Sequence, residues 1–363
     1  MKIMYVITQG TWGGAQAHLF SLIRSQVALG NQVWLITGTS GRLTQTVESE
    51  FPTVNVFILN YLVRQMSIRK DLCTAHVLRK YFKKINPDII HLHSTKAGMV
   101  GRIAAIGIKS KVIYTVHGWA FTPGVSLKQR YLARVVEMLL QPLTSVYICV
   151  SKYDYDLGCR MRIINGRHPG IVIKNGVIKQ VYKVQKEKRF FLTMAARFDK
   201  QKRQDILIRA LAEANISEIK VCLLGSGPSL EQCKKLAEDL GLKANIFFAG
   251  SVNNVQKYYA QSAVGILISD YEGLPVSLVE AIAQGLPIIA SNVGGNNELI
   301  NHNGYLVEND PRDIASKIKI LSENAVLRNS LGLQSVKVFE DEYTEKKMLQ
   351  HTNQVYVQLL GEK

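Results

Sequence analysis

The stretch AVGILISDYEGLPVSLVEAIAQGLPIIAS, residues 263–291, contains one complete strand, helix and strand pattern. It opens with the continuous apolar run 263–269, which is typical of a strand buried on both faces. Pro275 then suits the first turn of a helix that holds Glu280. The apolar run 286–291 predicts a second strand. Two buried strands joined through a helix indicate a parallel sheet covered by helices, and therefore an α/β fold.

The same alternation of strands and helices extends along the whole chain. In the first half, strands are predicted at 3–7, 32–37, 88–94, 111–117 and 145–151; in the second, they are predicted at 190–197, 219–227, 245–250, 263–269 and 286–291. Two Rossmann-like halves follow from this pattern. Such sheets bind ligands beyond the carboxyl ends of their strands, so the residues just after each strand are the candidates for a site.

The domain boundaries are predicted from a change in composition. The polar, basic segment 179–189 interrupts the apolar pattern and is interpreted as a linker. We therefore expect an N-terminal domain over 1–182 and a C-terminal domain over 183–345. A last helix over 346–363 is expected to pack back on the N-terminal domain.

Bulk composition limits the class of protein. A chain of 363 residues with 47% hydrophobic and 20% charged residues can bury a large core. No apolar run approaches the roughly 20 residues of a membrane-spanning helix. The first residues, 1–14, are typical of a strand and a glycine turn and not of a secretory signal. The five cysteines show no CxxC pairing, which favours a reducing compartment, so a cytoplasmic location is predicted.

Charge is distributed unequally between the two halves. Residues 1–180 hold 23 Lys and Arg against 7 Asp and Glu, whereas residues 181–363 hold 22 against 21. A basic half attracts polyanions, which include nucleic acid, an anionic membrane and a phosphorylated acceptor. No nucleic-acid recognition motif is present, so nucleic acid is not expected as a partner. The segment 61–84, and a second with Lys128, Arg130 and Arg134, form either membrane-binding or solvated helix faces.

In the first half, glycines and histidines follow the predicted strands. Gly13 and Gly14 precede a helix, where backbone N–H groups form either an anion site or a plain turn. Their GxxGG spacing differs from GxGxxG, and the second strand ends without an acidic residue, so a dinucleotide-binding loop is not predicted. His117 lies at a strand-to-loop corner and is a candidate ligand contact. His91 and His93 form an HxH pair with no nearby carboxylate except Asp88; packing is favoured for His91, and no metal site is predicted.

In the second half, two loops carry positive charge or glycine. Arg197 and Lys202 follow a strand and form either a clamp for a diphosphate or a solvated basic loop. Gly225 and Gly227 form a turn after the next strand, which allows close approach by a base or a phosphate.

The stretch 263–291 holds two carboxylates with seven residues between them. Glu272 lies in the loop after the strand, and Glu280 lies in the helix that follows. Such carboxylates can accept hydrogen bonds from the hydroxyls of a sugar and of a ribose. Gly294 and Gly295 form another turn before Glu298, which is expected at a helix start and is either a ligand or a capping residue.

Taken together, these residues resemble glycosyltransferase family 4, the large retaining family of the GT-B fold. The resemblance covers nearly the whole chain, and its specificity lies in the order and spacing of the motifs. They are GG at 13–14, HGWAF from His117, VS at 150–151, NGV at 175–177, the Arg197 and Lys202 pair, GSGP at 225–228, the EX7E pair of Glu272 and Glu280, and GGNNE ending at Glu298.

Two positions depart from the family pattern, and one feature indicates a subgroup. Ile178 stands where many relatives carry Asp, and Ala196 stands where Gly is usual before Arg197. These departures concern fine donor geometry and not the class of enzyme. HGWAF followed by the basic helix KQRYLAR resembles bacterial surface-polysaccharide enzymes.

The resemblance implies an α/β fold of two Rossmann-like α/β/α domains that face a central cleft, and a role for each candidate residue. Glu272 and His117 would be catalytic. The donor diphosphate would be bound by Arg197, Lys202, Gly13, Gly14, Gly294 and Gly295; the nucleotide and its ribose by Glu280, Gly225 and Gly227; and the transferred sugar by Glu272, Gly273, Leu274 and His117. Glu298 would be structural or capping.

The resemblance also implies a reaction and its partners. A sugar would pass, with retention of anomeric configuration, from a nucleotide sugar, expected to be a UDP-sugar, to a lipid-phosphate-linked saccharide in surface polysaccharide synthesis. No cofactor and no metal are expected. The protein is then predicted to be peripheral on the inner face of the plasma membrane, in contact with its anionic surface. The alternatives are a GT-B epimerase that acts on sugar nucleotides and a non-catalytic polyanion-binding protein.

Overall fold

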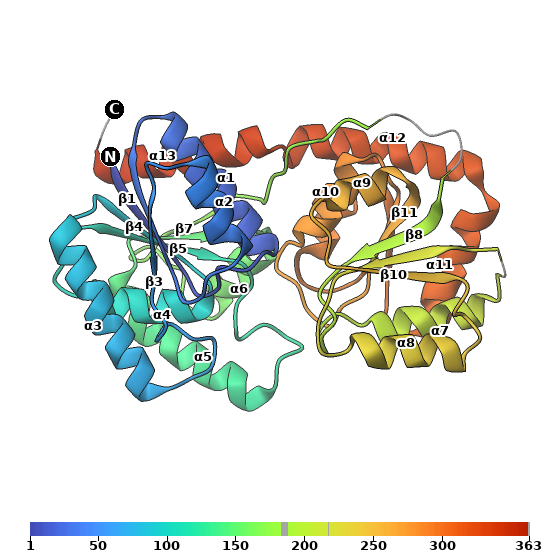
Figure 1. Cartoon of the computed structure of the whole chain (residues 1–363), viewed down its shortest axis with the longest axis horizontal. Helices are drawn as coiled ribbons and strands as arrows, with labels where there is room; N and C mark the ends of the chain where they lie inside the picture. The colour runs from blue at the N-terminus through green and yellow to red at the C-terminus, as the bar shows by residue number, and fades with distance from the viewer. Residues whose placement is uncertain (183–187, 217, 362–363) are drawn as a thin grey trace. The chain divides into compact units, whose positions relative to one another are not determined.

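Two parallel sheets, each in its own α/β unit, organise the chain (Figure 1). The computed structural model describes residues 1–182, 188–216 and 218–361. The first unit consists of Met1–Lys174 together with the C-terminal residues from Glu345, and the second consists of Asn175–Thr344.

The division between the units falls after Lys174, earlier than the predicted boundary between 182 and 183. The physical reason is that the residues just after Lys174 are bonded into the second unit. Asn175 donates its side-chain amide to the Leu274 carbonyl at 2.7 Å. Val177 pairs with Thr344 in an isolated parallel bridge. Residues 183–187 of the predicted linker lie outside the described residues.

In the first unit, the described residues form a seven-stranded parallel sheet of order β3-β2-β1-β4-β5-β6-β7. The elements are β1 (Lys2–Ile7), α1 (Gly14–Ala28), β2 (Gln32–Thr37), α2 (Arg42–Glu50), β3 (Asn55–Ile58), α3 (Ile68–Ile85), β4 (Ile89–His93), α4 (Thr95–Ala104), β5 (Lys111–Val116), α5 (Leu127–Leu140), η1 (Gln141–Leu143), β6 (Val146–Cys149), α6 (Lys152–Arg160), β7 (Gly170–Val172) and, from the end of the chain, α13 (Glu345–Leu360).

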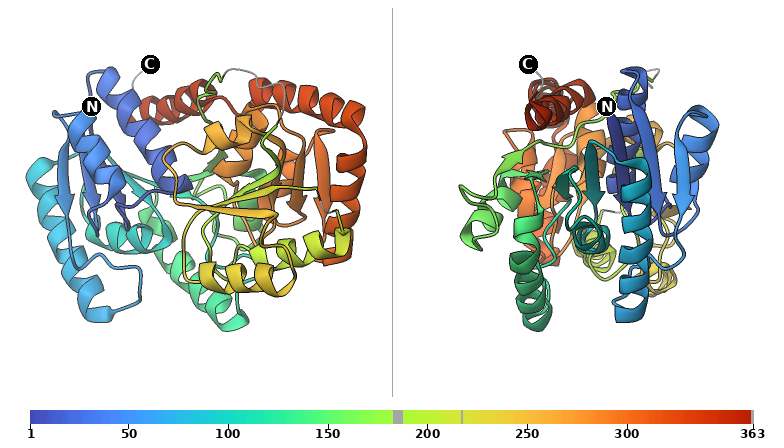
Figure 2. Two further views of the ribbon diagram at one scale, coloured as in Figure 1. Left: turned by 45° about the vertical axis from the view of Figure 1, so that its right-hand side comes forward. Right: turned by 90° about the vertical axis from the view of Figure 1, so that its left-hand side faces the viewer.

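Helices cover both faces of this sheet (Figure 2). Side chains alternate along a strand, so Met4 and Val6 of β1 enter one core while Tyr5 and Ile7 enter the other. The first core is closed by α3, α4 and α6, and the second by α1, α2 and α13. Burial on both faces explains why the strands are nearly continuous apolar runs.

In the second unit, the described residues form a six-stranded parallel sheet of order β10-β9-β8-β11-β12-β13. Helices α7, α8 and α11 pack together, as do α9, α10 and α12 (Figure 1). The elements are β8 (Phe190–Ala195), α7 (Gln204–Ala214), β9 (Val221–Leu224), α8 (Leu230–Asp239), β10 (Ile246–Gly250), α9 (Val255–Ala260), β11 (Ser262–Leu267), α10 (Val276–Ala283), β12 (Ile288–Ser291), η2 (Gly294–Leu299), β13 (Gly304–Val307), α11 (Pro311–Glu323) and α12 (Ala325–Glu342).

The ten predicted strands are confirmed, and three further strands were not predicted. The three are β3, β7 and β13, and each lies at the edge of its sheet. Most of their residues are partly or fully exposed. An edge strand of three or four residues with exposed side chains lacks the continuous apolar run by which a buried strand is recognised.

The two basic amphipathic segments form α3 and α5 in the first unit. Large apolar side chains of both helices are exposed, notably Ile68 and Leu72 on α3 and Leu127, Tyr131 and Leu139 on α5. Within the described residues, no helix combines the length and the apolar character that crossing a bilayer requires.

Candidate functional site

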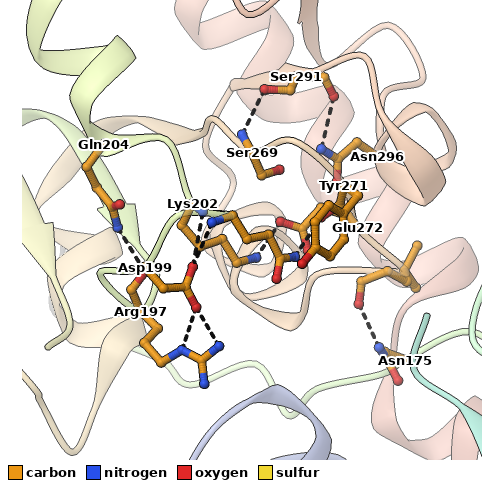
Figure 3. Close-up of polar contacts among 12 residues, drawn as sticks. Asn175, Arg197, Asp199, Lys202, Gln204, Ser269, Tyr271, Glu272, Ser291 and Asn296 are labelled. Carbon is orange, nitrogen blue, oxygen red and sulfur yellow. Dashed lines mark hydrogen bonds and ion pairs between the residues drawn. The ribbon is translucent and has the colours of Figure 1, made fainter. Parts of the chain in front are cut away.

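An ion pair between Lys202 and Glu272 lies at the carboxyl-terminal edge of the second unit's sheet (Figure 3). Lys202 follows β8 and Glu272 follows β11, and because these strands are neighbours their loops meet. The side chains are only 17% and 7% exposed. Gln201 ties the loops further, since its Nε2 donates to the Tyr271 carbonyl at 2.6 Å. The sequence motif thus places one cation and one carboxylate together in a largely dry setting.

Arg197, the second predicted cation, lies in the same loop and is paired with Asp199. Its Nε donates to Asp199 Oδ2 at 2.7 Å, and its side chain is 53% exposed. The other oxygen of Asp199 accepts the backbone N–H groups of Gln201 and Lys202 at 3.1 and 3.2 Å. Asp199 therefore shapes the loop that presents both cations. We did not predict this role, although an acid two residues after Arg197 is visible in the sequence.

Gly225 and Gly227 form the turn after β9, where the loop after β8 lies against them. Both have positive φ, +129° and +152°. A Cβ on Gly225 would lie 2.1 Å from the Ala196 carbonyl oxygen, and one on Gly227 would lie 2.2 Å from that of Phe198. The glycines are thus required by the close packing of two backbone segments. Their predicted contact with the nucleotide stays a prediction.

Gly294 and Gly295 join the loop after β12 to the loop that holds Glu272. Gly294 has φ +56°, and a Cβ there would lie 2.0 Å from the Glu272 carbonyl oxygen. The Gly295 N–H donates to the Gly273 carbonyl at 2.9 Å. The position of the Glu272 loop is therefore fixed by backbone contact with a glycine turn.

We expect Gly294→Ala to lower the midpoint of thermal unfolding by roughly 5–10 °C, because the new methyl group must displace the Glu272 backbone. Gly241→Ala is the matched control, since Gly241 has φ +71° and open space where a Cβ would lie. Left-handed strain alone should lower its midpoint by roughly 2–4 °C. Equal losses in the two variants would show that the contact between Gly294 and Glu272 is not rigid.

Buried polar atoms surround the Glu272 loop. Gly273 and Leu274 both offer their carbonyls, and that of Leu274 accepts the Asn175 amide at 2.7 Å. Within the described part of the chain, Asn175 Oδ1, Ser269 Oγ and Asn296 Oδ1 have no hydrogen-bond partner (Figure 3). Buried polar atoms without a protein partner call for water or a ligand. We did not predict a role for Ser269 or Asn296; the signal is the place of Ser269 just after β11 and of Asn296 just after the glycine turn.

Glu280 lies in α10 and is only partly exposed. Burial raises the pKa of its carboxyl group to about 7. At neutral pH the group is therefore poised between its charged and uncharged forms, which is unusual for a glutamate. A carboxyl group with a strongly perturbed pKa is a feature of functional sites.

Glu298 was expected at a helix start, and this expectation is wrong. The residue lies near the end of the short helix η2, after both glycines of the turn. Its backbone carbonyl accepts the Tyr343 hydroxyl at 2.6 Å. A carboxylate caps a helix only in the first turn, where backbone N–H groups are free, so Glu298 is not a capping residue.

In the first unit, Gly13 is the N-cap of α1, and Gly14 is its first residue. The Gly13 backbone is extended, and none of the described side chains caps it, so the first N–H groups of the helix are not covered by a capping side chain. An anion could bind these groups and the positive end of the helix dipole. This role stays a prediction.

His117 follows β5 at the predicted strand corner, and its Nε2 lies 3.1 Å from His93 Nδ1. Burial, with added repulsion from His18 and His91, holds the pKa of His117 well below its usual range. His91 packs in the core as predicted, with Nδ1 bonded to Tyr356 Oη and Nε2 to Thr115 Oγ1, both at 2.6 Å. His18 on α1 was not predicted from the sequence, although it lies four residues after the glycine pair.

The structure thus gathers the predicted residues into two groups, one in each unit. In the second unit, the loops after β8, β9, β11 and β12 contact one another and bring together Arg197, Lys202, Glu272 and the four predicted glycines of the two turns. In the first unit, His117 lies against His18 of the helix that Gly13 and Gly14 begin.

Comparison with known proteins defines the class to which this fold and this site belong. The structure of HepE from Anabaena in complex with UDP and glucose superposes with a TM-score of 0.82 at 20% identity, covering 98% of this chain and 99% of that one. Two parallel-sheet α/β units of this kind are the GT-B fold of glycosyltransferases, so the predicted fold class is confirmed.

Two family models together span most of the sequence. Residues 12–180 match the model described as Glycosyltransferase Family 4, and residues 178–337 match Glycosyl transferases group 1. The chain belongs to glycosyltransferase family 4, and it is an enzyme of the glycosyltransferase class.

Curated relatives support the same assignment. The O-antigen biosynthesis glycosyltransferase WbnH of Escherichia coli is 30% identical over 322 residues, which are 87% of this chain and 89% of that protein. The UDP-Gal:alpha-D-GlcNAc-diphosphoundecaprenol alpha-1,3-galactosyltransferase of Escherichia coli is 29% identical over 315 residues, 81% of this chain and 80% of that protein.

Proposed function

We propose that this glycosyltransferase transfers a sugar from a UDP-sugar to a saccharide carried on a lipid diphosphate, with retention of anomeric configuration, in the synthesis of a surface polysaccharide. The observation that carries the proposal is the ion pair of the largely buried Lys202 with Glu272, in a loop fixed by Gly294. Support for UDP and for the lipid diphosphate comes from the name of the Escherichia coli galactosyltransferase and from the UDP bound to HepE. The name of WbnH, an O-antigen biosynthesis glycosyltransferase, supports a role in the synthesis of a surface polysaccharide.

The chemistry requires charge neutralisation and orientation. As the bond from sugar to phosphate breaks, negative charge grows on the leaving diphosphate, and cations held in place beforehand stabilise it. Lys202 and Arg197 would supply this charge, together with the N–H group of Gly294, while the Gly295 N–H keeps its hydrogen bond to the Gly273 carbonyl. Glu272 would then exchange part of its ion pair for hydrogen bonds from sugar hydroxyls.

The remaining roles concern the nucleotide, the sugar and the acceptor. In the proposal Glu280 binds the ribose, the turn of Gly225 and Gly227 approaches the base, and His117 contacts the transferred sugar. The acceptor hydroxyl attacks on the face that the diphosphate leaves, and a phosphate oxygen takes its proton, which retains the configuration. The proposed reaction needs no metal and no cofactor, so EDTA should not lower the rate of transfer.

The test is transfer from a panel of UDP-sugars to a lipid-diphosphate-linked saccharide by the purified protein. We expect UDP release that depends on the acceptor, and a product whose NMR coupling shows the donor's anomeric configuration. Inversion of configuration would overturn the retaining mechanism. Isomerised nucleotide sugar that forms without acceptor would show an epimerase, and binding of polyanions without UDP-sugar would show a non-catalytic protein.

The raised pKa of Glu280 gives the proposal a pH dependence. With a pKa of about 7, the carboxylate that would bind the ribose is roughly one tenth ionised at pH 6 and nine tenths ionised at pH 8. We expect UDP-glucose to bind about tenfold more tightly at pH 8 than at pH 6, as measured by calorimetry. The phosphates of this ligand do not titrate in the range. Glu280→Gln should bind with no such dependence.

The same pKa has the opposite effect on folding. Because the folded state holds the Glu280 proton up to about pH 7 while the unfolded chain releases it near 4.3, the contribution of this group to stability falls as the pH rises between these values.

The test of the ribose contact is the binding of UDP-glucose. A wild-type affinity for this ligand that does not change between pH 6 and pH 8 would contradict the contact.

We further propose that α5 places the protein on the anionic inner face of the plasma membrane, where a lipid-linked acceptor lies. Leu127, Tyr131 and Leu139 are 77%, 74% and 72% exposed on a helix that also carries Lys128. Exposed apolar side chains among cations suit the interface of an anionic bilayer.

Vesicle co-sedimentation tests this location. We expect binding to vesicles that contain anionic phospholipid, little binding to neutral vesicles, and a several-fold loss in Leu139→Gln. Leu333→Gln is the matched control, because Leu333 is 74% exposed on α12 in the second unit. Binding that is indifferent to anionic lipid, or equally weakened by both variants, would contradict the role of α5.

A further inference from the structure

Three histidines from separate elements of the first unit converge, and the proposed transfer uses only one of them. His18 lies on α1, His93 ends β4, and His117 follows β5. One ring nitrogen of each lies within 4.8 Å of the corresponding nitrogens of the other two. We call these three residues the histidine cluster.

The ring nitrogens of His93 and His117 are as close together as two ligands of one metal ion. His93 Nδ1 and His117 Nε2 are 3.1 Å apart, and the His18 ring meets the His117 ring edge-on with centroids 5.0 Å apart. Zn–N bonds are about 2.0–2.1 Å long, so two nitrogen ligands of one ion lie at most about 4.2 Å apart. The pair from β4 and β5 meets this limit, and a side-chain shift of less than about 1 Å brings in His18.

His93 and its neighbour His91 differ in the hydrogen bonds of their ring nitrogens. His91 is bonded at both ring nitrogens. His93 is fully buried, and among the described residues its Nε2 has no hydrogen-bond partner. A buried nitrogen without a partner is unfavourable, so the His93 ring is not held at both nitrogens by the protein as the His91 ring is.

We propose that the histidine cluster is a binding site for one divalent transition-metal ion of the zinc type. Three imidazoles without a carboxylate select Zn²⁺, Ni²⁺ or Cu²⁺ and not Mg²⁺, which prefers oxygen ligands. Three protein ligands leave a fourth position of a tetrahedral ion open to water or to an oxygen of a bound molecule. His117 is the partly exposed member of the cluster.

A consequence follows that rests on the proposed function. An ion held by His117 occupies the imidazole that would contact the transferred sugar. Zinc should therefore inhibit transfer, and a chelator should restore it.

The experiment is a Zn²⁺ titration of tag-free protein in competition with a chromophoric chelator, with Co²⁺ absorption as a second probe. We expect one Zn²⁺ per chain, no competition by millimolar Mg²⁺, and an intense visible Co²⁺ spectrum typical of four-coordinate geometry. His18→Gln and His117→Gln should each weaken binding by at least about 100-fold. His76→Gln, at an exposed histidine of α3, should bind as the wild type does.

The possible outcomes test the metal site separately from the inhibition of sugar transfer by zinc. A wild-type protein that binds no Zn²⁺ at micromolar concentration, or His18→Gln and His117→Gln variants that bind it unchanged, would overturn the site. If His18→Gln fails to unfold cooperatively, His117→Gln alone decides, because its side chain is not fully buried. Tight, cluster-dependent zinc that leaves transfer unaffected would uphold the site and contradict only the role of His117.

Discussion

Replacement of Lys202 by Met is expected to lower the rate of sugar transfer by roughly 10²- to 10³-fold. The reason is that a cation held in a partly dry site stabilises the charge of the leaving diphosphate, and one such group contributes a factor of this size. Lys234→Met is the matched control, since Lys234 forms an exposed ion pair with Glu231 on α8. It should leave the rate unchanged.

A loss of stability must be separated from a loss of chemistry in this variant. Without Lys202, Glu272 is left as a buried charge that has lost its ion-pair partner, which lowers stability by about 3–5 kcal/mol. The double variant Lys202→Met with Glu272→Gln removes both charges and should recover much of the thermal stability while staying inactive. A Lys202→Met enzyme with the wild-type kcat would contradict the role of the cation.

Much of the fold could be predicted because its strands are buried on both faces. Ten apolar runs became ten strands, while β3, β7 and β13 were missed because edge strands share their surface with solvent. The domain boundary was placed late for a related reason. The change in composition begins only at the predicted linker, 179–189, and only contacts with residues as distant as Leu274 and Thr344 attach the residues just after Lys174 to the second unit.

The candidate site was partly predictable. A sequence motif indicates which residues belong to a site, but it does not show which of them contact one another. Lys202 and Glu272 could be found from their place after strands, but the ion pair between them depends on the adjacency of β8 and β11. Asp199 and the contact of Gly294 with the Glu272 backbone have no local signal beyond composition. The histidine cluster was missed because His18 comes from a helix whose apolar pattern gives no reason to examine it.

A second large effect is expected in the first unit, where Arg102 and Glu137 form a buried ion pair. Arg102 Nη1 and Nη2 each donate to one oxygen of Glu137 at 2.8 Å, and Nε donates to the Gly98 carbonyl at 2.7 Å. The guanidinium also lies 4.7 Å from the centroid of the Tyr114 ring. The side chains are 0% and 4% exposed.

Glu137→Ala should lower stability by about 3–5 kcal/mol, because it leaves Arg102 charged and buried without its partner. Thermal unfolding should show a midpoint lower by roughly 10 °C. Asp156→Ala is the control, since Asp156 pairs with Lys152 on the surface of α6, and exposed pairs of this kind contribute less than about 1 kcal/mol. Equal effects in the two variants would contradict the importance of burial.

The pair also explains how α5 can present apolar residues to solvent. A surface helix usually attaches to its domain through a buried apolar stripe. In α5 the buried residues are Glu137 and Leu140, while Leu127, Tyr131 and Leu139 point outward. An ionic contact with Arg102 thus replaces much of the usual apolar anchor.

Replacing both partners tests this account. Arg102→Met with Glu137→Leu should stay folded, because packed apolar residues often replace a buried ion pair at no loss of stability. Its vesicle binding should then match the wild type, since the outward face of α5 is unchanged. Glu137→Ala should instead bind vesicles less well in proportion to the loosening of α5. A double variant that folds but no longer binds vesicles would show that the ion pair orients α5 and does more than attach it.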